Sequence, residues 1–253
     1  MQIFDSHAHY DDKKFDCDRD EILSSLPLKG VCAVLNCASD INSAKMSIEL
    51  AEKYPYIYAA VGIHPHEADT FNSNTINELK ELAKHPKVAA IGEIGLDYHY
   101  DFSPREIQRE ALKAQIKLAK ELLLPVVLHD REAHEDMYKI LREFAPLRGV
   151  MHCFSGSAEL AKESVKMGLH IGLGGAVTFK NAKTPLEVAK DIPLERLLLE
   201  TDAPYMSPVP YRGKRCDSSM IPLAAESIAG VRGISADEVL AAARVNASKL
   251  FKI

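Results

Sequence analysis

Short apolar runs with the length and composition of buried parallel strands recur along the whole chain. Eight of these runs are present, at residues 2–6, 31–36, 57–63, 88–94, 124–129, 149–153, 169–173 and 196–201. Amphipathic stretches with a helical period lie between them. A strand followed by a helix, eight times in 253 residues, predicts a (β/α)8 TIM-type barrel forming a single domain over residues 1–253. The alternative, a doubly wound sheet, would have fewer units and a topological switch point.

Several predicted helices begin with a residue that can cap free backbone N–H groups, followed three positions later by an acid. These starts are Asp18 with Glu21, Ser103 with Glu106, Thr184 with Glu187, and Ser235 with Glu238. The last of them opens a helix that is expected to extend to about Phe251. The segment 203–220, rich in Pro, Gly and basic residues, is the longest candidate for a substrate-facing loop.

The composition is that of an ordinary globular protein, with 47% hydrophobic and 26% charged residues. The net charge of −5 lacks the basic excess typical of nucleic-acid-binding domains, so a nucleic-acid substrate would have to be held locally, by metal and a few basic side chains. The five cysteines are odd in number and form no C-x-x-C pair, which favours a reducing compartment. With no signal peptide and no apolar run of roughly 18 residues, we expect a cytoplasmic protein without membrane association.

Residues that ligate metals follow the predicted strands at five of their carboxyl ends. They are His7, His9, Glu93, His129, His152 and Asp202. In a barrel these ends meet at one opening, where active sites are built. A single histidine at a strand end is usually a hydrogen-bonded polar residue, but five independent coincidences, each leaving a polar side chain in an apolar barrel, would be costly. The pattern therefore predicts a metal centre.

Six ligands exceed the three or four that one catalytic zinc takes, which favours two adjacent divalent cations. A shared carboxylate would hold two cations close together, and Glu93 is the candidate bridge. Four imidazoles suit Zn²⁺, Mn²⁺ or another transition metal, whereas carboxylates with a phosphate substrate also accommodate Mg²⁺.

Six segments, in order along the chain, match the motifs of one family. They are Asp5-Ser6-His7-Ala8-His9, Val61-Gly62-Ile63-His64-Pro65-His66, Ala90 to Tyr98 (AIGEIGLDY), Pro125-Val126-Val127-Leu128-His129, His152-Cys153-Phe154-Ser155-Gly156 and Glu200-Thr201-Asp202-Ala203-Pro204-Tyr205. With Arg212-Gly213-Lys214-Arg215, the sequence resembles the TatD family of metal-dependent deoxyribonucleases, within the amidohydrolase-like barrels. The resemblance implies that the six strand-end residues are the metal ligands, that Mg²⁺ serves in activity, and that DNA phosphodiesters are hydrolysed, often by an exonuclease.

The chain departs from the family at Cys216-Asp217-Ser218, where Asn-Glu-Pro is usual. This change leaves the six ligands in place and affects the substrate loop, and with it the preference for strands or ends. Glu93 occupies a position where several related amidohydrolases use a modified lysine, which favours the nuclease branch.

We assign the catalytic group to Asp202, Glu93 and His64. Asp202 would ligate metal and accept the proton of the attacking water, and His64 would touch a phosphate or the leaving oxygen. For His64 and the neighbouring His66, the alternative is a hydrogen-bonded loop histidine.

Arg212 and Arg215 are candidate substrate-binding residues, together with Lys214, because guanidinium groups bind phosphate through two hydrogen bonds. The alternative is a solvated basic loop. Glu200 shares strand parity with Asp202 and is expected to point inward, supporting a ligand histidine from behind or forming an ordinary buried pair.

Two other functions compete with the nuclease. An amide, ester or lactone hydrolase, including an aminoacyl-tRNA deacylase, can use the same centre, and the basic 212–215 segment favours phosphate over it. A non-catalytic barrel would be expected to have lost ligands, and all six are present. We therefore expect DNA as the substrate and no obligate protein partner.

Overall fold

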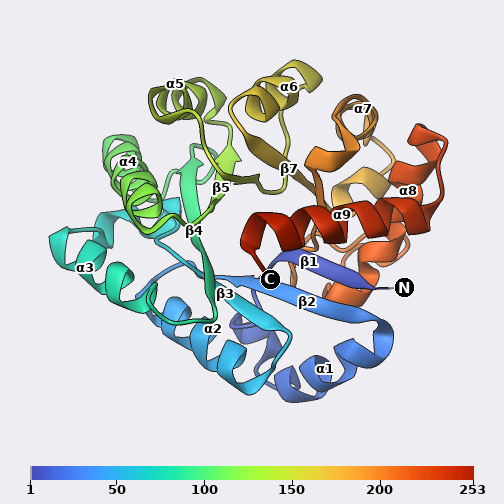
Figure 1. The fold of residues 1–253 in the computed structure, drawn as a ribbon, viewed down its shortest axis with the longest axis horizontal. Coiled ribbons are helices and arrows are strands. Elements are labelled where there is room, and N and C mark those ends of the chain that lie inside the picture. Colours follow the sequence, from blue (N-terminus) through green and yellow to red (C-terminus); the bar gives the residue numbers. More distant parts are fainter. Residues whose placement is uncertain (1) are drawn as a thin grey trace.

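The computed structural model describes residues 2–253 and contains one eight-stranded sheet (Figure 1). Neighbouring strands pair in sequence order, and each pair from first to last is parallel. The strands are β1 (Ile3–Ala8), β2 (Val31–Cys37), β3 (Ile57–Val61), β4 (Val88–Asp97), β5 (Val126–Arg131), β6 (Gly149–Met151), β7 (Leu169–Leu173) and β8 (Leu197–Leu199). The predicted (β/α)8 barrel is confirmed.

Helices surround the sheet and cover its outer face (Figure 1). They are α1 (Arg19–Ser25), α2 (Ile41–Lys53), α3 (Ser73–Leu82), α4 (Arg105–Leu122), α5 (His134–Phe144), α6 (Ala158–Lys166), α7 (Lys183–Asp191), α8 (Ile221–Arg232) and α9 (Ala236–Phe251). Short 3-10 helices are η1 (Lys13–Phe15), η2 (Leu26–Lys29), η3 (Pro65–Thr70), η4 (Gly175–Thr178), η5 (Leu194–Arg196) and η6 (Ser218–Met220). None of the described helices has both the length and the apolar composition of a membrane span.

Of the predicted helix starts, the one before α9 has the predicted cap, and those before α1, α4 and α7 differ from the prediction. At α9, Ser235 and Glu238 form the expected reciprocal cap. Asp18 precedes α1 without a side-chain capping bond, and α7 begins at Lys183, before Thr184. Ser103 does not cap α4, because its hydroxyl donates to the carbonyl of His66 and accepts from the N–H of Asp69. A tertiary contact thus replaces the local cap.

The two ends of the barrel differ in polarity. At the amino end of the strands, the C-terminal part of α9 packs against the sheet, and the rings of Phe4 and Phe251 lie 6.1 Å apart. This apolar layer also includes Leu35, Val127 and Leu198. Since apolar side chains fill the lower interior, polar side chains facing inward are concentrated at the carboxyl end of the strands.

Asp5, buried in β1, joins the first strand to the segment that follows the last. Its Oδ1 accepts from the backbone N–H groups of His7 and Thr201, and its Oδ2 from the hydroxyls of Thr201 and Ser218, both at 2.6 Å. Beside it, the N–H of Asp202 donates to the carbonyl of His7 at 2.9 Å. These bonds close the barrel where two predicted ligand segments meet.

We expect Asp5→Ala to lower the free energy of unfolding by roughly 2–4 kcal/mol at about pH 5.5, because four buried donors lose their acceptor. Burial raises the pKa of Asp5 from 3.8 to about 7. Between about pH 4 and pH 7 the folded protein therefore holds a proton on Asp5 that the unfolded chain has lost. As a result, the contribution of Asp5 to the free energy of unfolding declines as pH rises through this range. The difference in free energy of unfolding between wild type and variant should therefore be smaller at about pH 8 than at about pH 5.5. Urea unfolding at both pH values measures it, with the exposed Glu226→Ala on α8 as the control; equal stabilities at pH 5.5 would contradict it.

Candidate metal centre

The structure brings the six predicted ligands together at the carboxyl end of the barrel. They are His7 on β1, His9 just after it, Glu93 on β4, His129 on β5, His152 after β6 and Asp202 after β8. His7, Glu93 and His152 are buried, whereas the Asp202 side chain is 20% exposed. The cluster is therefore anchored inside the barrel and opens to solvent on one side.

The two oxygens of Glu93 face different sets of imidazoles. Oε2 lies 3.2 Å from His7 Nε2 and 3.5 Å from His9 Nε2. Oε1 lies 2.8 Å from His129 Nδ1 and 3.0 Å from His152 Nε2. Asp202 extends the first set, with Oδ1 at 3.4 Å from His9 Nε2 and 3.7 Å from His7 Nε2. One carboxylate thus stands between two groups of nitrogen donors.

These separations fit metal ligation. Donor atoms bound to one cation at roughly 2.1 Å, with tetrahedral or octahedral angles, lie about 3.0–3.4 Å from one another. His7 Nε2 and His9 Nε2 face each other at 3.0 Å, which lies in this range. A cation between them and the carboxylates would satisfy all of these atoms at once.

The outer nitrogens of three histidines face acceptor oxygens. His9 Nδ1 lies 2.7 Å from the carbonyl of Cys37, and His129 Nε2 lies 3.2 Å from Asp97 Oδ2. His152 Nδ1 lies 3.4 Å from Glu200 Oε1, although this contact does not have hydrogen-bond geometry. An outer N–H leaves the lone pair on the inner nitrogen, which is the arrangement that metal-ligating histidines adopt. The residues present therefore fit a divalent cation at this centre.

Without a cation, the acidic and basic groups compensate one another. Burial alone would raise the pKa of Glu93, but His152, His7 and His64 hold it well below its usual value. Burial alone would lower the pKa of His9, yet Asp202 and Glu93 raise it to about 9. A ligand histidine must be neutral, so cation binding releases protons.

Two predicted ligands lie beyond their strands. The prediction placed His152 at the end of strand six and Asp202 at the end of strand eight, but β6 ends at Met151 and β8 at Leu199. Asp202 has a left-handed backbone, with φ of 60°. Both side chains still face the centre, because the His152 N–H donates to the Leu128 carbonyl of β5 and the Asp202 N–H donates to the His7 carbonyl of β1, each at 2.9 Å. Loop geometry and barrel closure, rather than strand alternation, direct Asp202.

His64 differs from the predicted ligand histidines in its hydrogen bonding, because a backbone N–H donates to its ring. Its Nδ1 accepts from the backbone N–H of His66 at 3.1 Å, so its Nε2 carries the hydrogen. This Nε2–H points toward Glu93 Oε1 at 3.5 Å. Burial lowers the pKa of His64 to about 4, which keeps the ring neutral at physiological pH. His64 is therefore a hydrogen-bond donor at the edge of the cluster.

Asp97 connects the cluster to the next loop, a role that the sequence did not reveal. Its buried Oδ2 accepts from His66 Nε2 at 2.8 Å and from His129 Nε2 at 3.2 Å. Burial would raise its pKa, but His129, the Tyr100 N–H and His66 bring the pKa below its usual value. The sequence signal was a carboxylate four residues after Glu93, at the end of a strand, which was also compatible with a purely structural loop residue.

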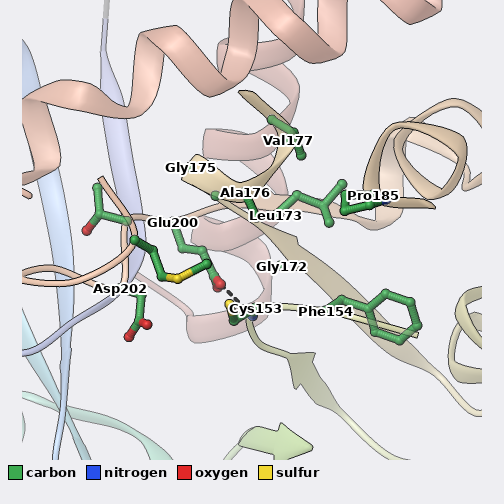
Figure 2. Close-up of a pocket in the computed structure, with 13 residues that line it drawn as sticks. Cys153, Phe154, Gly172, Leu173, Gly175, Ala176, Val177, Pro185, Glu200 and Asp202 are labelled. Atoms are coloured by element: carbon green, nitrogen blue, oxygen red, sulfur yellow. Dashed lines mark hydrogen bonds between the residues drawn. The ribbon is translucent and has the colours of Figure 1, made fainter. Parts of the chain in front are cut away.

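Glu200 lies 3.4 Å from the outer nitrogen of His152, and it lines a small cavity (Figure 2). Its Oε1 accepts from the backbone N–H of Cys153, as the dashed line in Figure 2 marks. A Cβ at Gly172 would lie 2.4 Å from Glu200 Oε2, so the missing side chain of this glycine makes room for the carboxylate. Glu200 thus occupies the position expected of a residue that orients His152.

The two predicted phosphate-binding arginines lie in different surroundings. The Arg212 guanidinium stacks 3.8 Å over the ring of Phe179, on an exposed loop. Arg215 pairs with Asp18 at 2.5 Å and stacks over Phe15. Within residues 2–253 the Arg212 guanidinium stacks on a ring without a hydrogen bond to the protein, whereas Arg215 joins the loop after β8 to the N-terminal segment.

Comparisons with known proteins agree with this geometry. Residues 4–252 match the family model described as TatD related DNase. The chain is 44% identical to a Bacillus subtilis protein named as an uncharacterized metal-dependent hydrolase, YabD, covering 99% of both. It is 35% identical to a 3'-5' ssDNA/RNA exonuclease TatD from Erwinia tasmaniensis, covering 99% of this chain and 100% of that one.

Among solved structures, the TatD homologue YJJV from Escherichia coli K12 superposes with a TM-score of 0.93. It is 33% identical, and the match covers 99% of this chain and 98% of that one. The family model, the relatives and the structure agree over nearly the whole chain. The chain therefore belongs to the TatD family of metal-dependent hydrolases.

Proposed function

We propose that this protein hydrolyses DNA phosphodiester bonds, as an exonuclease, with two divalent cations held on either side of Glu93. The observation that carries the proposal is the division of imidazoles between the two oxygens of Glu93. His7, His9 and Asp202 would hold one cation, and His129 with His152 the other. Support for a nucleic-acid substrate comes from the relatives named as single-strand DNA/RNA exonucleases.

Divalent cations at such a centre lower the pKa of a water molecule and neutralise charge on the phosphoryl oxygens. The chain supplies the proton acceptor and the orientation. Burial would raise the pKa of Asp202, but hydrogen bonding to His9 and the charges of His152 and His7 keep it below its usual value. Asp202 is therefore ionised and partly exposed on the open side of the cluster, in a position to accept a proton.

His64 has the complementary role. As a neutral imidazole with its hydrogen on Nε2, it can donate to a phosphate or leaving oxygen above Glu93. Because Asp97 binds His129 and His66 rather than His64, the His64 N–H, 3.5 Å from Glu93 Oε1, can donate to a substrate oxygen.

The first test is cleavage of end-labelled single- and double-stranded DNA by protein stripped with chelator and then given Mg²⁺, Mn²⁺ or Zn²⁺. We expect metal-restored cleavage, and a loss of roughly 100-fold or more in His129→Ala, because one cation loses an essential ligand. His85→Ala, far from the centre beside Glu52, is the matched control. Absence of cleavage by folded, metal-loaded protein would overturn the proposal, and hydrolysis of carbonyl esters instead would identify the amide and ester hydrolases.

The second test counts cations. Wild type should bind two Zn²⁺ or Mn²⁺ ions in isothermal titration, and His9→Ala should retain one. Glu93→Gln should weaken both sites by more than roughly 100-fold, exceeding the roughly 10- to 100-fold loss typical of residues that only orient a ligand. Circular dichroism verifies the fold of each variant. A single ion in wild type, or unchanged binding in Glu93→Gln, would contradict the bridging role.

The third test concerns Arg212. Removing one phosphate contact should reduce the slope of log K against log salt by about one. We expect this change in Arg212→Ala, measured with a cleavage-resistant phosphorothioate oligonucleotide. Arg215→Ala should change the slope less, because Asp18 already engages that guanidinium. An unchanged slope in Arg212→Ala would refute its contact with phosphate.

A further inference from the structure

Exposed aromatic side chains gather at the opening that contains the metal centre. Within residues 2–253, the aromatic rings with the largest exposure are Tyr100, Phe102, Tyr205 and Tyr211, at 49%, 67%, 43% and 40%. All four lie on two loops, those that follow β4 and β8, at the carboxyl end of the strands. Burial of apolar surface would favour the opposite distribution, so these rings are candidates for ligand contact.

Tyr100 and Phe102 form one continuous surface with His66. The rings of Tyr100 and Phe102 are stacked, with centroids 5.2 Å apart and planes at 23°. His66 presents its edge to both, at 5.3 and 4.9 Å. The Arg131 guanidinium lies 4.7 Å from the Tyr100 ring. We call Tyr100, Phe102 and His66 the aromatic platform.

Buried polar residues hold this exposed platform in place. Asp97 Oδ1 accepts from the N–H groups of His99 and Tyr100, at 3.0 and 2.9 Å. The Ser103 hydroxyl donates to the carbonyl of His66, and Gln108 Nε2 donates to the carbonyl of Ser103. Asp97, Ser103 and Gln108 are at most 1% exposed. The rings are thus preorganised, which lowers the entropic cost of binding.

The platform adjoins the metal centre through Asp97. Its Oδ2 binds both the platform residue His66 and the predicted ligand His129. The rings of His66 and His129 are 6.4 Å apart. A stacked strand rises roughly 3.4 Å per nucleotide, and Tyr100 and Phe102 lie one ring beyond His66, so they are within about three nucleotides of a phosphate at the centre.

We infer that Tyr100 and Phe102 stack an unpaired nucleobase close to the scissile phosphate. The inference rests on the proposed function and assigns its substrate-binding residues. Every base offers a π-face, so aromatic stacking binds single strands without sequence preference. Arg131 beside Tyr100 supplies positive charge for the flanking phosphate.

A protein partner fits this surface less well. Stable protein interfaces bury roughly 800 Å² on each partner, far more than two rings on one short loop offer. A base in a duplex is already stacked and paired, so it would have to be unstacked before it reached the platform. An unpaired base at a strand end is small enough for two rings and does not have to be unstacked or unpaired first.

The test compares kcat/KM of wild type, Phe102→Ala and Tyr100→Ala on a single-stranded DNA oligonucleotide and on the same oligonucleotide lacking the bases at its cleaved end. We expect the alanine variants to lose roughly 5- to 100-fold on the complete oligonucleotide, mainly through KM. On the abasic oligonucleotide, wild type and variants should be equal. Phe102→Trp should preserve activity, and Leu28→Ala, exposed at the opposite end of the barrel, serves as control.

Binding of a phosphorothioate oligonucleotide, followed by fluorescence anisotropy, separates this inference from the proposed function. If wild type cleaves no DNA, the nuclease proposal fails, and weaker binding by Phe102→Ala of the complete but not the abasic oligonucleotide still supports the platform. Equal cleavage and binding by wild type and both alanine variants would overturn the inference. An equal loss on complete and abasic oligonucleotides would also overturn it, since stacking needs the base.

Discussion

The buried carboxylate of Glu93 is the constraint around which the centre is built. A carboxylate removed from water is costly unless compensating groups surround it. Here His7 and His9 approach one oxygen, and His129 and His152 approach the other. These histidines come from strands on different sides of the barrel, so the parallel, in-order sheet is what allows one side chain to meet them all.

A second layer of acceptors determines what the imidazoles can do. The carbonyl of Cys37, the carboxylate of Asp97 and the carboxylate of Glu200 each face the outer nitrogen of one histidine. At His64 the arrangement is reversed, because a backbone N–H engages Nδ1 and leaves a donor facing inward. Chemically identical side chains are thus suited to be metal ligands or a donor according to which backbone or carboxylate group lies behind them.

The sequence predicted what depends on strands and the barrel, and missed what depends on loops. Eight apolar runs were sufficient for the fold, and the strand-end rule was sufficient to bring His7, Glu93 and His129 to one opening. The link from Asp97 to His66 and His129 spans 31 and 32 residues in sequence, and no local pattern encodes such a pairing. The hydroxyl of Ser103 shows the same limit, since its local pattern indicated a cap while the fold uses it as a tertiary bridge.

Cations at this centre would affect the binding of a phosphate as well as its hydrolysis, because they change the charge at the opening. Glu93, Asp97, Glu200 and Asp202 place four carboxylates around the opening, in a chain with a net charge of −5. Without cations, protonated histidines compensate these carboxylates, so the opening offers a phosphate little net attraction. Cations held by Glu93 would displace the histidine protons and supply positive charge that attracts the phosphate. The platform would then contribute the uncharged part of affinity, because stacking of a base on Tyr100 and Phe102 does not depend on that potential. With the proposed substrate, this combination of cation attraction and base stacking would allow an acidic protein to hold a polyanion without a basic surface.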